Sequence, residues 1–375
     1  MTATVQQICN LLEKLAPRYL AEKWDNVGLQ VGNPCQKVNR ILVTLDITEE
    51  VLNEASDKDV DMIISHHPLI FEPLKKIHLN TWAGKILRDI LCKGFAVYAC
   101  HTNLDAGKDG LNSWLAERLG LVHTEILKET FCEDLNKLVV FVPKGFEDKV
   151  MNAMAATGAG WIGKYSHCTF QTRGTGTFKP LSGAVPFIGD VGRLERVEEV
   201  RIETIMENYK TKDIVSAMLK CHPYEEVAYD IYPLKNRSET VHGLGRIGQL
   251  EKEETLDSFL KSVKERLNVK NLRIVSENME QKVKKVAVCG GAGASLIHVA
   301  STKKADLFLT GDIKYHDALK ARELGLILVD AGHSDTEKVM LEGVKRYLLK
   351  EFKEKGFRDM EVLESECDAE LILKY

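Results

Sequence analysis

The chain has 375 residues, which is more than a single hydrophobic core usually serves, so we expect two domains. Hydrophobic residues make up 44% and charged residues 28%, as in ordinary globular proteins, and a formal net charge of −4 without a basic stripe argues against a nucleic-acid partner. Nine scattered cysteines without a Cys-x-x-Cys pair indicate reduced, mostly buried thiols. Because neither a signal peptide nor a long apolar run is present, we expect a cytoplasmic protein that does not contact a membrane.

Strand and helix patterns alternate over residues 1–128, which is typical of a mostly parallel α/β sheet. Apolar spacing predicts a helix over 5–16 that Pro17 ends, followed by a turn within 24–32 that leads into a short strand. The remaining predicted elements are strands at 41–45, 61–65 and 95–100 and helices at 49–56, 82–92 and 111–119.

The pattern changes from about Phe131, where glycine and β-branched residues become frequent. The predicted elements are a strand at 137–143, a helix at 146–157, strands at 163–172 and 198–206, a helix at 214–219 and a strand at 227–234. This order is typical of a ferredoxin-like α+β domain. We therefore predict an inserted domain over 129–238, bounded by the polar run 235–240.

The α/β pattern returns over 239–375. Predicted helices cover 255–267, 295–301, 317–323 and 335–352, and predicted strands cover 272–275, 286–289, 307–309 and 326–329. The predicted fold is therefore a discontinuous α/β core made of residues 1–128 and 239–375, interrupted by the inserted domain.

Two adjacent histidines follow the predicted strand 61–65, and Pro68 stops that strand. In open α/β sheets, ligands bind beyond the carboxyl ends of the strands. Neighbouring side chains on extended backbone point in opposite directions, so His66 and His67 would each serve a different ion of a two-metal site. For an isolated pair, the alternative is one core histidine and one surface histidine.

Two further pairs place a histidine four residues before an acid, also after predicted strands. His333 and Glu337 would lie at one end of a helix and suit zinc or manganese, although acids there also complement a helix dipole. Asp105 is a candidate bridging carboxylate or a helix cap, and His101 a candidate for proton transfer. Several such stretches together favour one shared metal site.

Three other stretches carry weaker indications. The run 243–248 matches G-x-G-x-x-G, but it lacks the strand-to-helix context of a dinucleotide site. The glycine-rich run 290–295 would hold an anion or, as we favour, pack closely in a tight turn. Asp312, Lys314 and His316 fit substrate contacts or capping and surface positions equally well, so we assign none of them as a ligand.

The chain resembles the NGG-one-interacting-factor-three-like proteins, also known as GTP cyclohydrolase I type 2 homologues. The segments that carry the resemblance are 24–32, 65–68, 101–105, 289–293, 309–312 and 332–337. It implies two divalent ions per chain, held by His66, His67, Asp105, His333 and Glu337. It also implies a homohexamer.

The insertion resembles the PII/CutA-like domain that longer members of this family carry. Residues 174–180 and 221–227 carry this second resemblance. His222, Tyr224 and Glu225 would form a small ligand site or, as we favour, serve structure and assembly.

The resulting hypothesis is a metal-dependent hydrolase that opens the ring of a purine nucleotide and releases formate, with His101 as the catalytic residue. The ions would be zinc, with manganese and iron as alternatives. A second hypothesis is a hexameric scaffold that binds metal and a metabolite without turnover. A third is metal storage or trafficking, which a ligand set without thiolate disfavours for copper or zinc.

Overall fold

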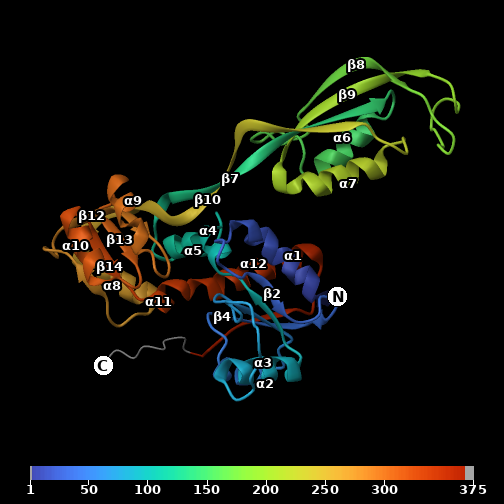
Figure 1. Cartoon of the computed structure of the whole chain (residues 1–375). Helices are drawn as coiled ribbons and strands as arrows, with labels where there is room; N and C mark the ends of the chain where they lie inside the picture. The colour runs from blue at the N-terminus through green and yellow to red at the C-terminus, as the bar shows by residue number, and fades with distance from the viewer. Residues whose placement is uncertain (1, 368–375) are drawn as a thin grey trace. The chain divides into compact units, whose positions relative to one another are not determined.

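The computed structural model describes residues 2–367, and the chain divides into two compact units (Figure 1). The core unit comprises the segments up to Thr130 and from His242 onward, and the inserted unit comprises Phe131–Val241. The sequence placed these boundaries at 129 and 238. Two long strands, β7 (Val122–Pro143) and β10 (Tyr229–Thr255), contribute to both units.

The N-terminal sheet of the core unit has the strand order β15-β4-β5-β6-β2. Its first four strands are parallel, and β2 is antiparallel to β6. Strands β4 to β6 are almost wholly buried, as expected for parallel strands that are covered on both faces. The strands are β2 (Gly28–Val31), β4 (Arg40–Thr44), β5 (Met62–Ser65), β6 (Ala96–Ala99) and β15 (Glu361–Glu364), and a separate ribbon pairs β1 (Ala3–Thr4) with β3 (Lys37–Val38).

The C-terminal sheet of the core unit has the strand order β11-β14-β13-β12-β10, which is one end of an eight-stranded sheet that continues into β7, β9 and β8. Strands β12, β13 and β14 are parallel, whereas β11 and β10 are antiparallel to their neighbours. The strands are β11 (Arg273–Val275), β12 (Lys282–Val288), β13 (Leu307–Thr310) and β14 (Ile327–Asp330).

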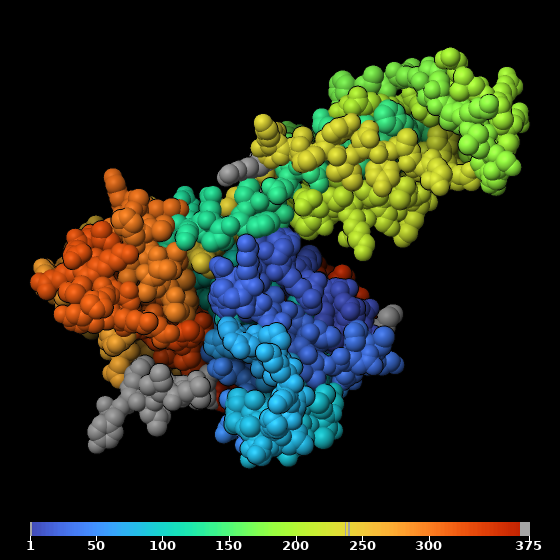
Figure 2. All heavy atoms as spheres, viewed as in Figure 1, coloured from blue at the N-terminus to red at the C-terminus, as the bar shows by residue number. Residues whose placement is uncertain are grey.

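Helices cover both faces of each sheet in the core unit. Helices α2 and α3 pack on one face of the N-terminal sheet, and α9 and α10 pack on one face of the C-terminal sheet. The opposite faces share one large buried core with α1, α5, α8 and α12. Figure 2 shows the blue and cyan N-terminal segment packed against the orange C-terminal segment. The helices are α1 (Val5–Leu15), α2 (Glu49–Asp57), α3 (Trp82–Lys93), α4 (Thr102–Ala106), α5 (Leu111–Arg118), α8 (Leu256–Leu267), α9 (Ile297–Thr302), α10 (Tyr315–Glu323), α11 (His333–Glu337) and α12 (Val339–Lys355).

The inserted unit has the order strand, helix, strand, strand, helix, strand along the chain. Its sheet runs β10-β7-β9-β8, the strand order of a ferredoxin-like fold. Apolar side chains of β7, β9, α6 and α7 form its core. The elements that belong to this unit alone are α6 (Glu147–Ala156), β8 (Thr169–Phe178), β9 (Glu195–Glu207) and α7 (Thr211–Cys221).

Several sequence predictions are corrected by the structure. Strand β8 begins at Thr169 rather than at 163, because 161–168 forms a tight turn. Strands β7 and β10 extend through polar stretches that read as loops, since many of their side chains are exposed. Residues 102–106 are helical instead of loop, and the helix expected over 335–352 is broken at Lys338. Strand β15 was not predicted.

The structure bears on two predictions drawn from the sequence. All nine cysteines lie in the described part of the chain and are free thiols, but only Cys9, Cys100 and Cys289 are buried, so the expectation of mostly buried thiols is wrong. Within residues 2–367, every helix is too short or too polar to cross a membrane.

Candidate metal centre

The predicted site residues meet where parallel strands of the two core-unit sheets end. Strands β4, β5 and β6 of the N-terminal sheet are parallel, and their last residues pair with one another, so the strands end side by side. The same holds for β13 and β14 of the C-terminal sheet. The residues that follow these strands are Asp46, His66 and His67, His101, Asp312 and His333. The carboxyl ends of parallel strands are the usual ligand position in such sheets.

His66 and His67 both face the same centre, contrary to the expectation for extended backbone. Strand β5 has already ended at Ser65, yet their backbone N–H groups still donate to Thr44 O at 3.1 Å and to Leu45 O at 2.9 Å. These two hydrogen bonds fix the backbone after the strand has ended, so the two side chains no longer point in opposite directions. Their ring centroids lie only 5.1 Å apart. His66 is fully buried, whereas His67 remains partly exposed.

Glu337 lies in the middle of the imidazoles. Its carboxylate is 3.2 Å from Nε2 of His333, one turn earlier on α11, as the i, i+4 spacing predicted. It is also 3.6 Å from Nε2 of His66 and 3.3 Å from Nε2 of His67. Gly291 has φ 60°, and a Cβ there would lie 2.3 Å from Glu337 Oε1. The glycine-rich run 290–295 therefore packs closely, as favoured, and it makes room for this carboxylate.

His101 and Asp105 complete the cluster from β6 and α4. The His101 ring centroid is 5.2 Å from that of His66 and 5.5 Å from that of His67. Asp105 lies inside α4, with Oδ1 3.7 Å from Nε2 of His66. Both side chains therefore reach the centre, from two positions of one short segment.

Each of the four histidines is oriented by a hydrogen bond from Nδ1. The acceptors are Cys100 O for His66 (2.8 Å), Asp46 for His67 (2.9 Å), Asp25 for His101 (2.9 Å) and Asp312 for His333 (2.7 Å). Metal-binding histidines almost always carry such a second bond, which fixes the tautomer and leaves Nε2 for the ion. Asp25 and Asp46 were not predicted from the sequence, and Asp312 was considered there only as a substrate contact or as a capping or surface residue.

The inner atoms of the cluster lack hydrogen-bond partners. Among the described residues, buried side-chain atoms without a partner include His66 Nε2, Asp105 Oδ1 and Glu337 Oε2, although each lies within 4 Å of an opposite group. An unsatisfied buried polar atom is costly. Two overlapping sets bring donor atoms within 4.8 Å of one another, namely His66, His67 and His101, and His67, His333 and Glu337. These residues therefore fit a divalent metal centre.

The charges of the cluster respond to burial and to one another. Burial alone would raise the pKa of Glu337, but His66 and the other imidazoles hold it well below its ordinary value. Burial likewise opposes protonation of His67, yet its carboxylate partners raise the pKa to about 10. Glu337 raises the pKa of His333 to about 9, and burial raises that of Asp105 to about 6. Without an ion, His67 and His333 carry protons that metal binding must displace.

An aromatic pair lies beside the centre. Trp24 is 57% exposed, and its ring centroid is 5.7 Å from Phe71 and 5.9 Å from His101. The segment that carries Trp24 is tied to the loop after His67, because Ile70 N–H donates to Gln30 Oε1 at 2.9 Å. The stretch 24–32 therefore supplies both the Asp25 that orients His101 and an exposed ring next to it.

The G-x-G-x-x-G run 243–248 lies within β10, and its arginine contacts the segment that follows α4. Arg246 is buried and donates to the carbonyl oxygens of Gly107 and Lys108 at 2.6 and 2.8 Å. Burial lowers its pKa to about 10. These bonds hold the chain directly after α4, the helix that carries Asp105.

Comparisons with known proteins give matches that extend over nearly the whole chain. A model of the family described as Duf34/NIF3 (NGG1p interacting factor 3) matches residues 3–370. A Bacillus subtilis protein named GTP cyclohydrolase 1 type 2 homolog is 47% identical over 97% of this chain and 96% of its own length. A Halalkalibacterium halodurans protein of the same name is 45% identical over the same shares. The crystal structure of a Bacillus cereus protein related to NIF3 aligns with TM-score 0.90 and 45% identity, covering 100% of this chain and 99% of that one.

Proposed function

The chain belongs to the Duf34/NIF3 family, and we propose that it is a metal-dependent hydrolase with two divalent ions at this centre. The observation that carries the proposal is a set of four imidazoles, each held through Nδ1. Three of them, those of His66, His67 and His333, place Nε2 within 3.6 Å of the buried Glu337 carboxylate. We propose a purine nucleotide as substrate because the relatives are named for GTP cyclohydrolase.

We propose His66, His67, Asp105, His333 and Glu337 as the metal ligands. Imidazole and carboxylate donors suit zinc, manganese or iron, and zinc is our first choice. Cys289 follows β12, but its thiol donates to the Gly290 carbonyl oxygen, so we do not propose it as a ligand. When bound, the two ions would lower the pKa of a water molecule and orient it for attack.

His101 is the proposed proton-transfer residue. Asp25 accepts from its Nδ1–H and from the Thr102 backbone N–H, and these two residues lower the pKa of Asp25 to about 2 although burial opposes the shift. A carboxylate that stays ionised stabilises a protonated imidazole, so His101 could take a proton from water and pass it to a ring nitrogen of the substrate.

The exposed ring of Trp24, next to Phe71, supports a planar substrate. A purine could stack on Trp24 while its imidazole ring faces the centre, since aromatic rings favour offset stacking. The protein's share of the reaction would then be to hold the ring, exclude bulk water from one side and move the proton through His101.

For assembly we propose a homohexamer with a PII/CutA-like inserted domain. The support is the family resemblance and the ferredoxin-like strand order of the inserted unit. Light scattering should give a mass near six times that of the 42.1 kDa chain. A monomer or dimer at micromolar concentration would contradict the proposal.

The test is to load the protein with zinc, manganese or iron(II), incubate it with GTP and measure formate together with a ring-opened or pteridine product. We expect formate in proportion to product with at least one metal. Absence of both products with all three metals would contradict the hydrolase.

The variant His101→Gln separates two roles for this residue. A proton-transfer residue predicts full metal content and little turnover. A loss of metal in this variant would instead make His101 a ligand.

A second candidate function is a hexameric regulatory scaffold that binds metal and a metabolite without turnover. A cavity within the inserted unit, lined by aromatic and acidic side chains, favours it. This alternative predicts ligand-dependent thermal shifts in the absence of products. Deleting residues 129–238 would remove that response and leave the metal bound.

A further inference from the structure

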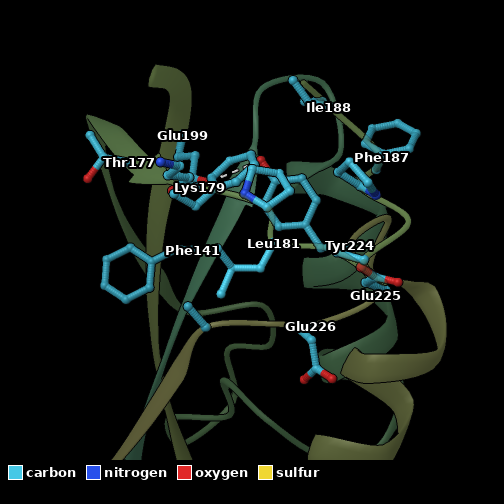
Figure 3. A pocket seen from close by; sticks show the side chains of 15 residues that line it. Phe141, Thr177, Lys179, Leu181, Phe187, Ile188, Glu199, Tyr224, Glu225 and Glu226 are labelled. Carbon is cyan, nitrogen blue, oxygen red and sulfur yellow. Dashed lines mark hydrogen bonds between the residues drawn. The ribbon is translucent and has the colours of Figure 1, made fainter. Parts of the chain in front are cut away.

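The inserted unit contains a cavity of about 370 Å³ that the proposed hydrolase does not use (Figure 3). The segments 174–180 and 221–227, which carry the resemblance of the insertion, meet there. The end of β8, the loop after it, the middle of β9 and the segment after α7 form its walls. The size suits a small organic molecule.

Aromatic rings form much of the wall. The Tyr224 ring centroid lies 5.9 Å from Phe178 and 6.4 Å from Phe187. Phe187 is 52% exposed and Leu181 is 69% exposed, although both are large apolar side chains. This arrangement leaves aromatic faces open to a ligand.

Three carboxylates and one ammonium group line the cavity, namely Glu199, Glu225, Glu226 and Lys179. In Figure 3, Glu199 and Glu226 lie on opposite sides of the cavity. The lining therefore carries an excess of negative charge next to exposed rings.

Two of the carboxylates are held in place by the protein. Tyr224 donates its hydroxyl to Glu199 Oε1 at 3.0 Å, and the Val185 N–H donates to Glu225 Oε1 at 2.9 Å. A Cβ at Gly176 would lie 2.0 Å from Glu199 Oε2, so only glycine leaves Glu199 its position. Glu199 is thus built into the wall, and Glu225 ties down the loop that closes one side.

His222 supports the pocket without lining it. Its Nε2–H donates to Phe141 O at 3.1 Å, and its Nδ1 accepts from the Tyr224 N–H at 3.1 Å. Both ring nitrogens are therefore used by the backbone. Of the three residues named from the sequence, His222 positions Tyr224, while Tyr224 and Glu225 face the cavity.

We propose that this pocket binds a small organic cation, an amine or a quaternary ammonium ion carried on an apolar body. Cations are attracted to the faces of aromatic rings, most strongly where water is excluded. Fixed carboxylates add attraction for a cation and repel an anion of the same size. A neutral hydrocarbon would cover the Glu199 carboxylate without compensating its charge.

The test titrates the full-length protein with phenyltrimethylammonium, with its neutral isostere tert-butylbenzene and with the anion benzoate, using ligand-observed NMR. The cation should bind in preference to both other probes. Glu199→Gln should weaken cation binding about tenfold, and Tyr224→Ala should weaken it by at least as much. Tyr224→Phe keeps the ring but loses the hydroxyl that holds Glu199, so it should cause a smaller loss.

Glu198→Gln is the matched control, because Glu198 is exposed, is paired with Lys144 and does not line the cavity. It should bind the cation like the wild type. Thermal unfolding and metal content check that each variant is folded. Equal binding of the three probes, no binding of the cation at about 10 mM, or wild-type affinity in Glu199→Gln would overturn the proposal.

Discussion

The candidate metal centre of the core unit and the cavity of the inserted unit both combine carboxylates with ring side chains, but they differ in how their polar atoms are satisfied. In the centre, inner atoms such as His66 Nε2 and Glu337 Oε2 are buried without hydrogen-bond partners. In the cavity, Glu199 and Glu225 accept hydrogen bonds from the protein, and the rings are open to solvent. The proposed centre therefore leaves buried polar atoms for an ion to satisfy, whereas Glu199 and Glu225 of the cavity already have partners within the protein.

Metal removal should give the largest effect and should separate the two units. An ion that binds only the folded state stabilises it by mass action, so chelation should lower the unfolding temperature of the core unit by about 10 °C. The inserted unit should unfold as before, because the buried side-chain atoms that lack a partner in the described part of the chain all lie in the core unit. Calorimetry together with hydrogen exchange on β5 and β9 would measure this. A fall of similar size in the unfolding temperatures of both units would contradict the predicted difference between them.

Removing the carboxylates that orient the histidines should give the next largest effect. Asp46→Ala and Asp312→Ala free Nδ1 of His67 and His333, and loss of such a partner lowers metal affinity about 10- to 100-fold. Competition with a chromogenic chelator would measure the affinity. Asp257→Ala, at an exposed position paired with Lys261, should leave it unchanged. Wild-type affinity in both test variants would mean that the observed orientation is incidental.

Trp24→Ala should weaken substrate binding and leave the metal in place. The ring lies beside His101 without bonding to the centre, so we expect KM for the nucleotide to rise about tenfold at full metal content. Trp24→Phe should retain most of the affinity. Trp82→Ala, at another exposed tryptophan, is the control for a general surface effect. Metal loss in Trp24→Ala would place this residue in the support of the centre instead.

The smallest expected effect is a pH dependence of the inserted unit. Burial is the main cause that lowers the pKa of His222 below its ordinary value of 6.5. The unfolded chain therefore binds a proton more readily than the folded one, so stability is complete above pH 6.5 and declines as the pH falls below it. Calorimetry should show this decline as a fall of no more than about 5 °C in the unfolding temperature of the inserted unit. Hydrogen exchange of β7 should show reduced protection over the same pH range. In His222→Gln the dependence should vanish, and its persistence would assign it to another group.

The sequence predicts the parts of the fold in which burial leaves a simple pattern. Strands β4 to β6, β13 and β14 are buried on both faces and read as apolar runs, so their positions were predicted closely. Of β12 only the buried second half was predicted, because its first half carries lysines. The polar stretches of β7 and β10 read as loops, because exposed strands carry no such run. Strand β15 pairs with β4, more than 300 residues earlier in the chain, and no local pattern marks that pairing.

The candidate site divides in the same way. Residue type and spacing pointed to His66, His67 and the pair His333 and Glu337, since each lies at a strand end or within one helical turn. The partnership of Asp25 with His101 spans 76 residues and depends on where β2 joins β6, so the sequence alone could not predict it. Such long-range partners are set by sheet register, which the structure alone supplies.

The most direct test of the account is metal content by mass spectrometry on untagged protein, comparing the wild type with Glu337→Gln and Glu342→Gln. Glu337 lies inside the centre, whereas Glu342 is an exposed glutamate of α12 that pairs with Arg118. We predict about two ions per chain in the wild type and in Glu342→Gln. Glu337→Gln should lose most of the metal while circular dichroism shows that it is folded. Absence of metal from the wild type, or full retention in Glu337→Gln, would contradict the proposed centre.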